Sequence, residues 1–156
     1  MTDLKDLAQS AVETLLQSDE DQLYEELGMR VQAMKRDLAV SASFAPDVTY
    51  DAEAMGPLDD LRDFGRIFFN RLNTQAWHLA CGTDAEDTEE RKELMEAFGV
   101  GKEAVAATLA AVLVAQLGLV PAVAAVVAAL IIKLFFRNVY GAMCDIWKKK
   151  LPEAGS

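Results

Sequence analysis

The chain has 156 residues, of which 52% are hydrophobic, and a formal net charge of -10. This length is typical of one domain with a core of its own. The acidic charge argues against direct binding to nucleic acid, because that binding needs lysine and arginine to displace counterions from phosphates. The excess acid lies in residues 1–103, which hold 23 acidic and 10 basic side chains, whereas residues 104–156 hold 2 and 5.

The first part of the chain predicts two amphipathic helices. Residues 3–16 place leucine, valine and alanine at helical spacing. Residues 19–40 follow with one apolar stripe, which is interrupted only at Gly28. Ser18 stands three residues before Asp21 and resembles a capping box in which aspartate replaces the usual glutamate. We expect both helices to bury one face and leave the other in solvent.

Residues 41–56 lose this periodicity and contain Pro46, which predicts a long loop. Connections of this length are uncommon in compact domains and are often functional, so the segment ranks second among the places to look for a binding site. The alternative that we favour is a plain connection that packs Phe44 and Tyr50 onto the core as it crosses.

Two more helices follow the loop. Residues 57–81 begin at Pro57, a residue that the first turn of a helix tolerates. The helix stops before Gly82, which can close it in the left-handed conformation. Residues 85–98 have acidic side chains crowded at their start, where the helix dipole favours them. They predict a short and strongly acidic helix.

The C-terminal part of the chain has no charged side chain over residues 104–132. Gly118 is a natural helix stop and Pro121 a natural first helical residue. The stretch therefore predicts a tight helical hairpin, with one helix over residues 102–117 and a second, continuous helix over residues 121–150.

The uncharged stretch is formally long enough to cross a bilayer, so it could lie either in a membrane or in the core of the protein. Eleven of its 29 residues are alanine, which contributes little to membrane insertion, and a polar residue, a glycine and a proline fall near its middle. Its first limb is only about 21 Å long, which is too short to span. Rows of alanine at helical spacing favour close packing of two helices. We therefore favour a buried hairpin. Two alternatives stay open: a hairpin that leaves the core for a membrane, and a segment that always spans the membrane.

The sequence as a whole predicts a single all-α domain over residues 1–152, followed by a short tail at 153–156. Five to six helices are expected, in which amphipathic helices wrap the apolar C-terminal hairpin. This architecture resembles that of colicin-type and Bcl-2-type proteins in its overall pattern alone. No motif is shared, so the resemblance implies no function.

The inventory of reactive side chains is too small for an enzyme. His78 is the only histidine, which excludes both a histidine-based catalytic triad and a metal site with two histidine ligands. Cys81 and Cys144 could join it as ligands, but no CxxC pair accompanies them, and no phosphate-binding or nucleophile motif is present. We expect no enzymatic activity, no metal and no cofactor.

The cysteine pattern and the N-terminal sequence predict the compartment. Cys81 and Cys144 lie far apart in the chain, and the first ten residues lack the basic and apolar regions of a signal peptide. We expect both cysteines to be free thiols and the protein to be cytoplasmic.

These observations favour a non-enzymatic helical interaction module, an adaptor or small subunit that binds a protein partner or itself. The alternative is a membrane-acting effector whose hairpin, residues 104–136, inserts into a bilayer when it is released. Under either hypothesis the candidate interaction or membrane-active residues are Val126, Ile131, Ile132, Phe135, Phe136, Trp147, Lys148, Lys149 and Lys150.

Overall fold

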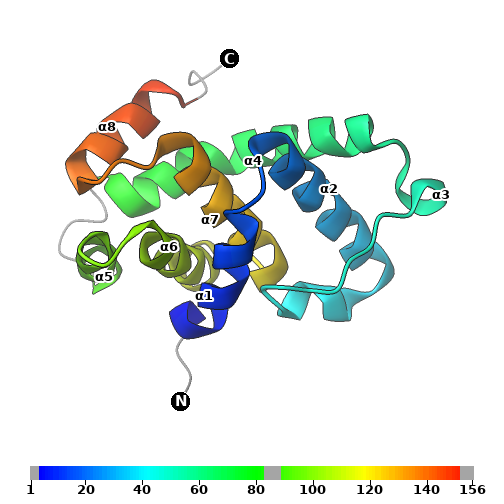
Figure 1. The fold of residues 1–156 in the computed structure, drawn as a ribbon, viewed down its shortest axis with the longest axis horizontal. Helices are drawn as coiled ribbons and strands as arrows, with labels where there is room; N and C mark the ends of the chain where they lie inside the picture. The colour runs from blue at the N-terminus through cyan, green and yellow to red at the C-terminus, as the bar shows by residue number, and fades with distance from the viewer. Residues whose placement is uncertain (1–3, 83–88, 152–156) are drawn as a thin grey trace.

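The protein is all-helical, as the sequence predicts. A computed structural model describes residues 4–82 and 89–151, which leaves residue 3, residues 85–88 and the tail at 153–156 of the predicted elements outside the described part. Within the described ranges the chain forms eight α-helices and one 3₁₀ helix, and no strand (Figure 1). The elements are α1 (Leu4–Leu15), α2 (Glu20–Arg36), η1 (Leu38–Ala42), α3 (Ala52–Met55), α4 (Leu58–Cys81), α5 (Glu89–Phe98), α6 (Lys102–Leu117), α7 (Pro121–Phe135) and α8 (Tyr140–Lys149).

The helix count exceeds the five to six predicted, because α3 forms within the expected loop and because the expected continuous helix over residues 121–150 is wrong. Helix α7 ends at Phe135 and α8 begins at Tyr140, and the two axes differ in direction by 93°. The break at residues 136–139 contains neither proline nor glycine. Because no local breaker is present, the bend must come from contacts that α8 makes elsewhere in the fold.

The segment predicted as a loop over residues 41–56 contains some helix. Helix α2 ends at Arg36 because Asp37 is extended, and the Asp37 carboxylate accepts a hydrogen bond from the backbone N–H of Ala39 at the start of η1. Helix α3 then forms within the segment. Phe44 is buried in the core, and the half-buried Tyr50 donates its hydroxyl hydrogen to the carbonyl of Gly56.

Two predicted helix ends are also corrected. The cap of α2 is Asp19 and not Ser18, because the N–H of Ser18 still bonds to the carbonyl of Leu15 at the end of α1. Asp19 and Gln22 form the reciprocal capping box. Gly82 ends α4 in an extended conformation (φ -73°, ψ 165°) and not in the left-handed one. A Cβ there would lie 2.5 Å from the carbonyl oxygen of His78, so glycine meets a steric need.

Helix α7 lies at the centre of the core. Every residue from Ala122 to Ile132 has at most 3% of its surface exposed. Helices α1, α2, α6 and α8, together with η1, all contact it. It is joined to α6 through Gly118, which is left-handed at φ 75°, and it begins with Pro121 in its first turn. Burial of so much aliphatic surface, at roughly 25 cal/mol per Å², is the main stabilising term of such a helix.

Helices α2 and α4 cross with their backbones in direct approach. A Cβ added to Gly28 would lie 2.5 Å from the carbonyl oxygen of Leu61, and one added to Gly65 would lie 2.1 Å from that of Tyr24. Real Cβ atoms do not come so close to backbone oxygen. The two glycines therefore set the separation of the helices.

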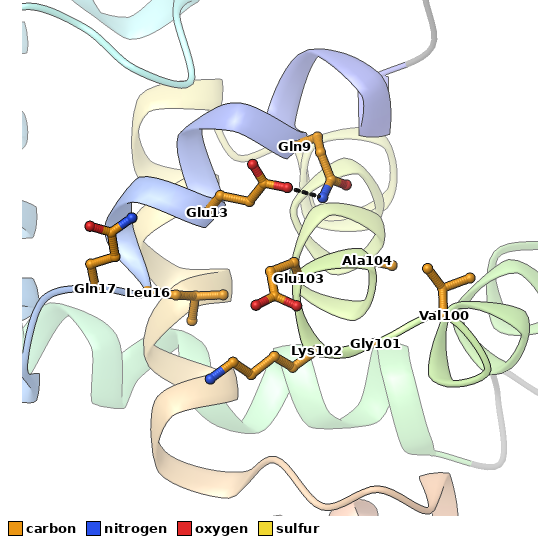
Figure 2. A pocket seen from close by; sticks show the side chains of 9 residues that line it. All are labelled: Gln9, Glu13, Leu16, Gln17, Val100, Gly101, Lys102, Glu103 and Ala104. Carbon is orange, nitrogen blue, oxygen red and sulfur yellow. Dashed lines mark hydrogen bonds between the residues drawn. The ribbon is translucent and has the colours of Figure 1, made fainter.

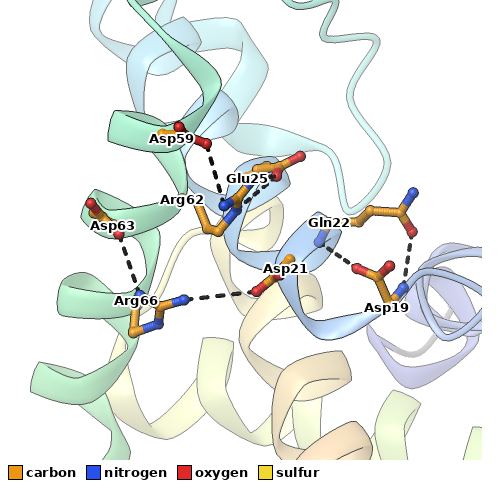
Figure 3. Close-up of polar contacts among 8 residues, drawn as sticks. All are labelled: Asp19, Asp21, Gln22, Glu25, Asp59, Arg62, Asp63 and Arg66. Atoms are coloured by element: carbon orange, nitrogen blue, oxygen red, sulfur yellow. Dashed lines mark hydrogen bonds and ion pairs between the residues drawn. The ribbon is translucent and has the colours of Figure 1, made fainter.

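Ion pairs frame this crossing on its solvent side (Figure 3). Arg62 on α4 reaches Glu25 on α2 at 2.7 Å, and Arg66 reaches Asp21 at 3.7 Å. All four side chains are partly or largely exposed, so the pairs orient the two helices more than they stabilise them.

Candidate functional site

A groove between α1 and α5, with α6 as its floor, is a candidate binding site on the described part of the chain. It consists of two adjoining hollows of about 600 and 210 Å³ that share Gln9, Val100 and Ala104. Figure 2 shows the larger hollow, with Gln9 and Glu13 of α1 facing the first turn of α6. We call it the α1–α5–α6 groove. Its lining comprises Lys5, Asp6, Gln9, Glu13, Leu16, Gln17, Glu93, Glu96, Ala97, Val100, Gly101, Lys102, Glu103, Ala104, Ala107 and Thr108.

The lining is predominantly acidic, with five carboxylates and two ammonium groups. None of the five carboxylates forms an ion pair with another described residue; Glu13 accepts a hydrogen bond from the neutral side chain of Gln9 at 2.7 Å. Like charges gathered in a concave surface reinforce one another's field. The carboxylates are those of Asp6, Glu13, Glu93, Glu96 and Glu103, and the ammonium groups are those of Lys5 and Lys102.

An apolar side chain stands where the two hollows meet. Val100 has 81% of its surface exposed, and the small residues Ala104 and Ala107 form the floor beside it. The groove therefore offers a partner a carboxylate-lined wall together with one apolar contact and a floor without bulky side chains.

Local sequence explains how the groove is built. Lys5, Gln9 and Glu13 follow one another at intervals of four residues, so they share one face of α1. Gly101, between α5 and α6, has φ 152°, a conformation that other residues rarely adopt. This turn allows α6 to begin at Lys102, directly beside the end of α5.

The structure places most of the predicted site residues inside the core. The rings of Phe135 and Trp147 are stacked with their centroids 5.7 Å apart, and Phe136 stacks on Phe98 at 5.8 Å. A role for these residues in binding or insertion stays a prediction, and it requires the core to open. The buried members of the predicted set are Val126, Ile131, Ile132, Phe135 and Trp147.

The basic members of the predicted set lie apart from these apolar ones. Lys148, Lys149 and Lys150 are exposed at the end of α8. The ammonium group of Lys148 lies 5.4 Å from the centroid of the Trp77 ring, within the range of a cation–π contact. The three lysines thus form a basic surface that lies outside the acidic groove.

The prediction of free thiols is wrong, because Cys81 and Cys144 form a disulfide with their Cα atoms 5.8 Å apart. Packing of α8 against the end of α4 brings together two residues that are 63 positions apart in sequence. A disulfide sulfur is not available as a nucleophile or metal ligand. Within the described ranges no group of three or more histidine, cysteine, aspartate or glutamate residues is arranged to hold a metal ion.

None of the described helices has, by itself, both the length and the hydropathy that a membrane span requires. Helices α7 and α8 have both when taken as one segment, but that segment carries the 93° bend.

Sequence reasoning did not identify the α1–α5–α6 groove. Its walls come from helices at opposite ends of the first hundred residues, and only the packing on α6 unites them. The helix dipole accounts for acidic residues at the start of α5 but not for Glu93 and Glu96, which lie beyond the first turn and are the sequence signal of a binding face. Comparison of the chain with protein-family models, curated proteins and solved structures finds no significant match.

Proposed function

We propose that this protein is a non-enzymatic helical interaction module, in which amphipathic helices shelter the apolar α6 and α7 and the α1–α5–α6 groove binds a positively charged segment of a protein partner. The observation that carries the proposal is the acidic lining, because five carboxylates without described ion-pair partners attract and orient a cationic ligand. Nucleic acid, with its phosphate charge, would be repelled from the same surface.

The shape of the groove favours a helical segment as its occupant. The hollows are bordered by α1, α5 and α6, and an amphipathic helix can lay one face against a surface that several helices form. Lysine or arginine side chains of the partner would meet Glu13 and Glu103 in the larger hollow and Glu93 and Glu96 in the smaller one. An apolar side chain between them would contact Val100.

A designed peptide tests this function. The probe is a fluorescently labelled amphipathic helix of alanine, leucine and lysine, and the control peptide has each lysine replaced by glutamate. We expect only the lysine peptide to bind, with an affinity that falls as salt is raised. The double variant Glu13→Lys/Glu96→Lys should weaken binding at least about tenfold, as fluorescence anisotropy would measure.

The matched control is Asp47→Lys/Glu53→Lys, which changes the net charge equally at exposed positions outside the groove. Equal weakening by both double variants would mean that the peptide responds to bulk charge alone, and the groove would lose its assignment. Binding of the glutamate peptide would have the same consequence.

Sedimentation velocity of the chain alone separates a foreign partner from self-association. The exposed run Lys148–Lys150 of a second copy is also basic. If the chain forms an oligomer and Glu13→Lys/Glu96→Lys makes it dissociate, that run of a second copy is the occupant. If the chain is a monomer, the groove is assigned to another protein.

We propose that the protein acts without metal or cofactor and is cytoplasmic. Free cysteines were one reason to expect a cytoplasmic location, and the disulfide removes that reason, since cytosolic proteins seldom keep a structural disulfide.

A second candidate function is insertion of the apolar hairpin over residues 104–136 into a membrane; α7, its second limb, reaches the length and hydropathy of a span only together with α8, across the 93° bend. We expect such an effector to release a dye trapped in anionic phosphatidylglycerol vesicles at acidic pH, and brominated lipids to quench Trp147. Vesicles that stay intact with Trp147 unquenched at every pH would exclude insertion.

A further inference from the structure

The last helix is fastened to α4 by one covalent bond. Cys81 is the final residue of α4, and Cys144 lies in the middle of α8. The disulfide bridges 63 positions of sequence and lies outside the α1–α5–α6 groove.

Three side-chain hydrogen bonds join the same two helices. The indole N–H of Trp77 donates to the carbonyl of Cys144 at 3.0 Å, and the Tyr140 hydroxyl donates to the carbonyl of Ala80. The indole N–H of Trp147 donates to the buried Asn73 side chain at 2.6 Å. Burial raises the pKa of Tyr140, which keeps its hydroxyl protonated as a donor.

These attachments account for the bend between α7 and α8. Nothing in residues 136–139 forces a break, since the segment has no proline or glycine. The stacking of Phe136 on Phe98 and the edge contact between Phe98 and Tyr140 lie at the turn and support it. The position of α8 is therefore set by its contacts with α4 and α5, and the disulfide is the strongest of them.

We propose that the Cys81–Cys144 disulfide is a redox-sensitive latch that holds α8 over the core, and that its reduction releases α8 from α4. Helices as short as α8, which has ten residues, have little stability without tertiary contacts. Once the cross-link is gone, the three hydrogen bonds and the packing of Met143 and Trp147 must hold α8 against the entropy of a free chain end. Release would uncover the apolar surface on which Met143 and Trp147 rest.

The reaction requires a dithiol reductant. A thiolate of the dithiol attacks the sulfur of Cys81, because Cys81 is the more exposed of the two residues: it is partly exposed, whereas Cys144 has 9% of its surface exposed. The protein S–S bond breaks, and the Cys144 thiolate leaves and takes a proton from solvent. The second thiol of the dithiol then loses its proton and attacks its own mixed disulfide. The dithiol is thereby oxidised to a disulfide, and Cys81 is released and protonated to a thiol.

The two tryptophans of the chain both lie at the latch and report on it. In the variant Trp77→Phe, which lacks the hydrogen bond to the carbonyl of Cys144 but keeps the disulfide and the other two bonds, Trp147 is the only tryptophan, and it is fully buried in the oxidised protein. We expect dithiothreitol to shift its emission to the red and to raise quenching by acrylamide several-fold. The double variant Cys81→Ser/Cys144→Ser in the Trp77→Phe background should show the red-shifted emission of the reduced protein even without reductant. Adding dithiothreitol should not change its emission.

Hydrogen exchange distinguishes local release from unfolding. In the wild-type chain we expect reduction to speed exchange of the α8 amides by about a hundredfold or more, while the α7 amides keep their protection. A protein in which titration finds two free thiols but Trp147 stays shielded would overturn the proposal, and the disulfide would then be a static brace. Equal loss of protection in α7 and α8 would overturn it as well.

Discussion

Replacing Gly65 with alanine is expected to destabilise the fold by about 3 kcal/mol or more, because the new methyl group has no room. Its carbon would lie 2.1 Å from the carbonyl oxygen of Tyr24, and a backbone atom cannot rotate away. Helices α2 and α4 would have to separate, which would loosen the edge-to-face contact between Tyr24 and Phe69. Urea unfolding followed by circular dichroism measures the loss.

The control for this prediction is Gly141→Ala on α8. Both glycines lie within helices, but a Cβ at Gly141 meets nothing within 4 Å. Helix propensity alone should then stabilise the protein by up to about 1 kcal/mol. If Gly65→Ala also stabilises it, the close approach of the two backbones is refuted. Gly28→Ala, with its Cβ 2.5 Å from the carbonyl oxygen of Leu61, is expected to lie between the two.

Replacing Arg30 with methionine is expected to cost about 3 kcal/mol. The arginine has 4% of its surface exposed, and one guanidinium nitrogen donates to the backbone carbonyls of both Phe44 and Ala122 at 2.8 Å. Its Nε donates to Glu26 at 2.9 Å. Burial lowers the pKa of Arg30 and the neighbouring Glu26 opposes that shift, so the guanidinium stays charged.

Methionine fills a similar volume but leaves these acceptors without their donor. The substitution therefore tests the polar contacts and not the packing. Thermal unfolding should show a midpoint lowered by roughly 6–12 °C for a chain of this length. Arg71→Met is the control, because Arg71 is an exposed residue on α4. Its loss should change the free energy of unfolding by less than about 0.5 kcal/mol. Equal effects of both substitutions would mean that the Arg30 contacts contribute nothing specific.

Arg30 and the two α2–α4 glycines show a limit of sequence reasoning. Gly28 is a weak point in an amphipathic pattern when α2 is considered alone, and Arg30 is one more charge on a polar helix. Their roles depend on atoms 14 to 92 positions away in the chain, or on another helix. No spacing rule within a helix contains that information.

Features that depend on neighbouring residues were predicted more successfully. The helical class follows from apolar periodicity, and the start and end of most helices follow from local chemistry such as the acidic first turns. The same local logic misplaced the cap at Ser18 by one residue, because the preceding turn still engaged that backbone. It also assigned the wrong conformation to Gly82, since both conformations can end a helix and only the path of the next segment selects one.

By itself the sequence determined that this protein is helical and that residues 122–132 are apolar enough to be buried, because periodicity and hydropathy are properties of short segments. Only the tertiary structure decided where α7 bends into α8, that Cys81 meets Cys144, and that five carboxylates line one groove. Each of these depends on which helix faces place distant residues together. That choice is made by the packing of all the helices at once, so it cannot be read from any one of them.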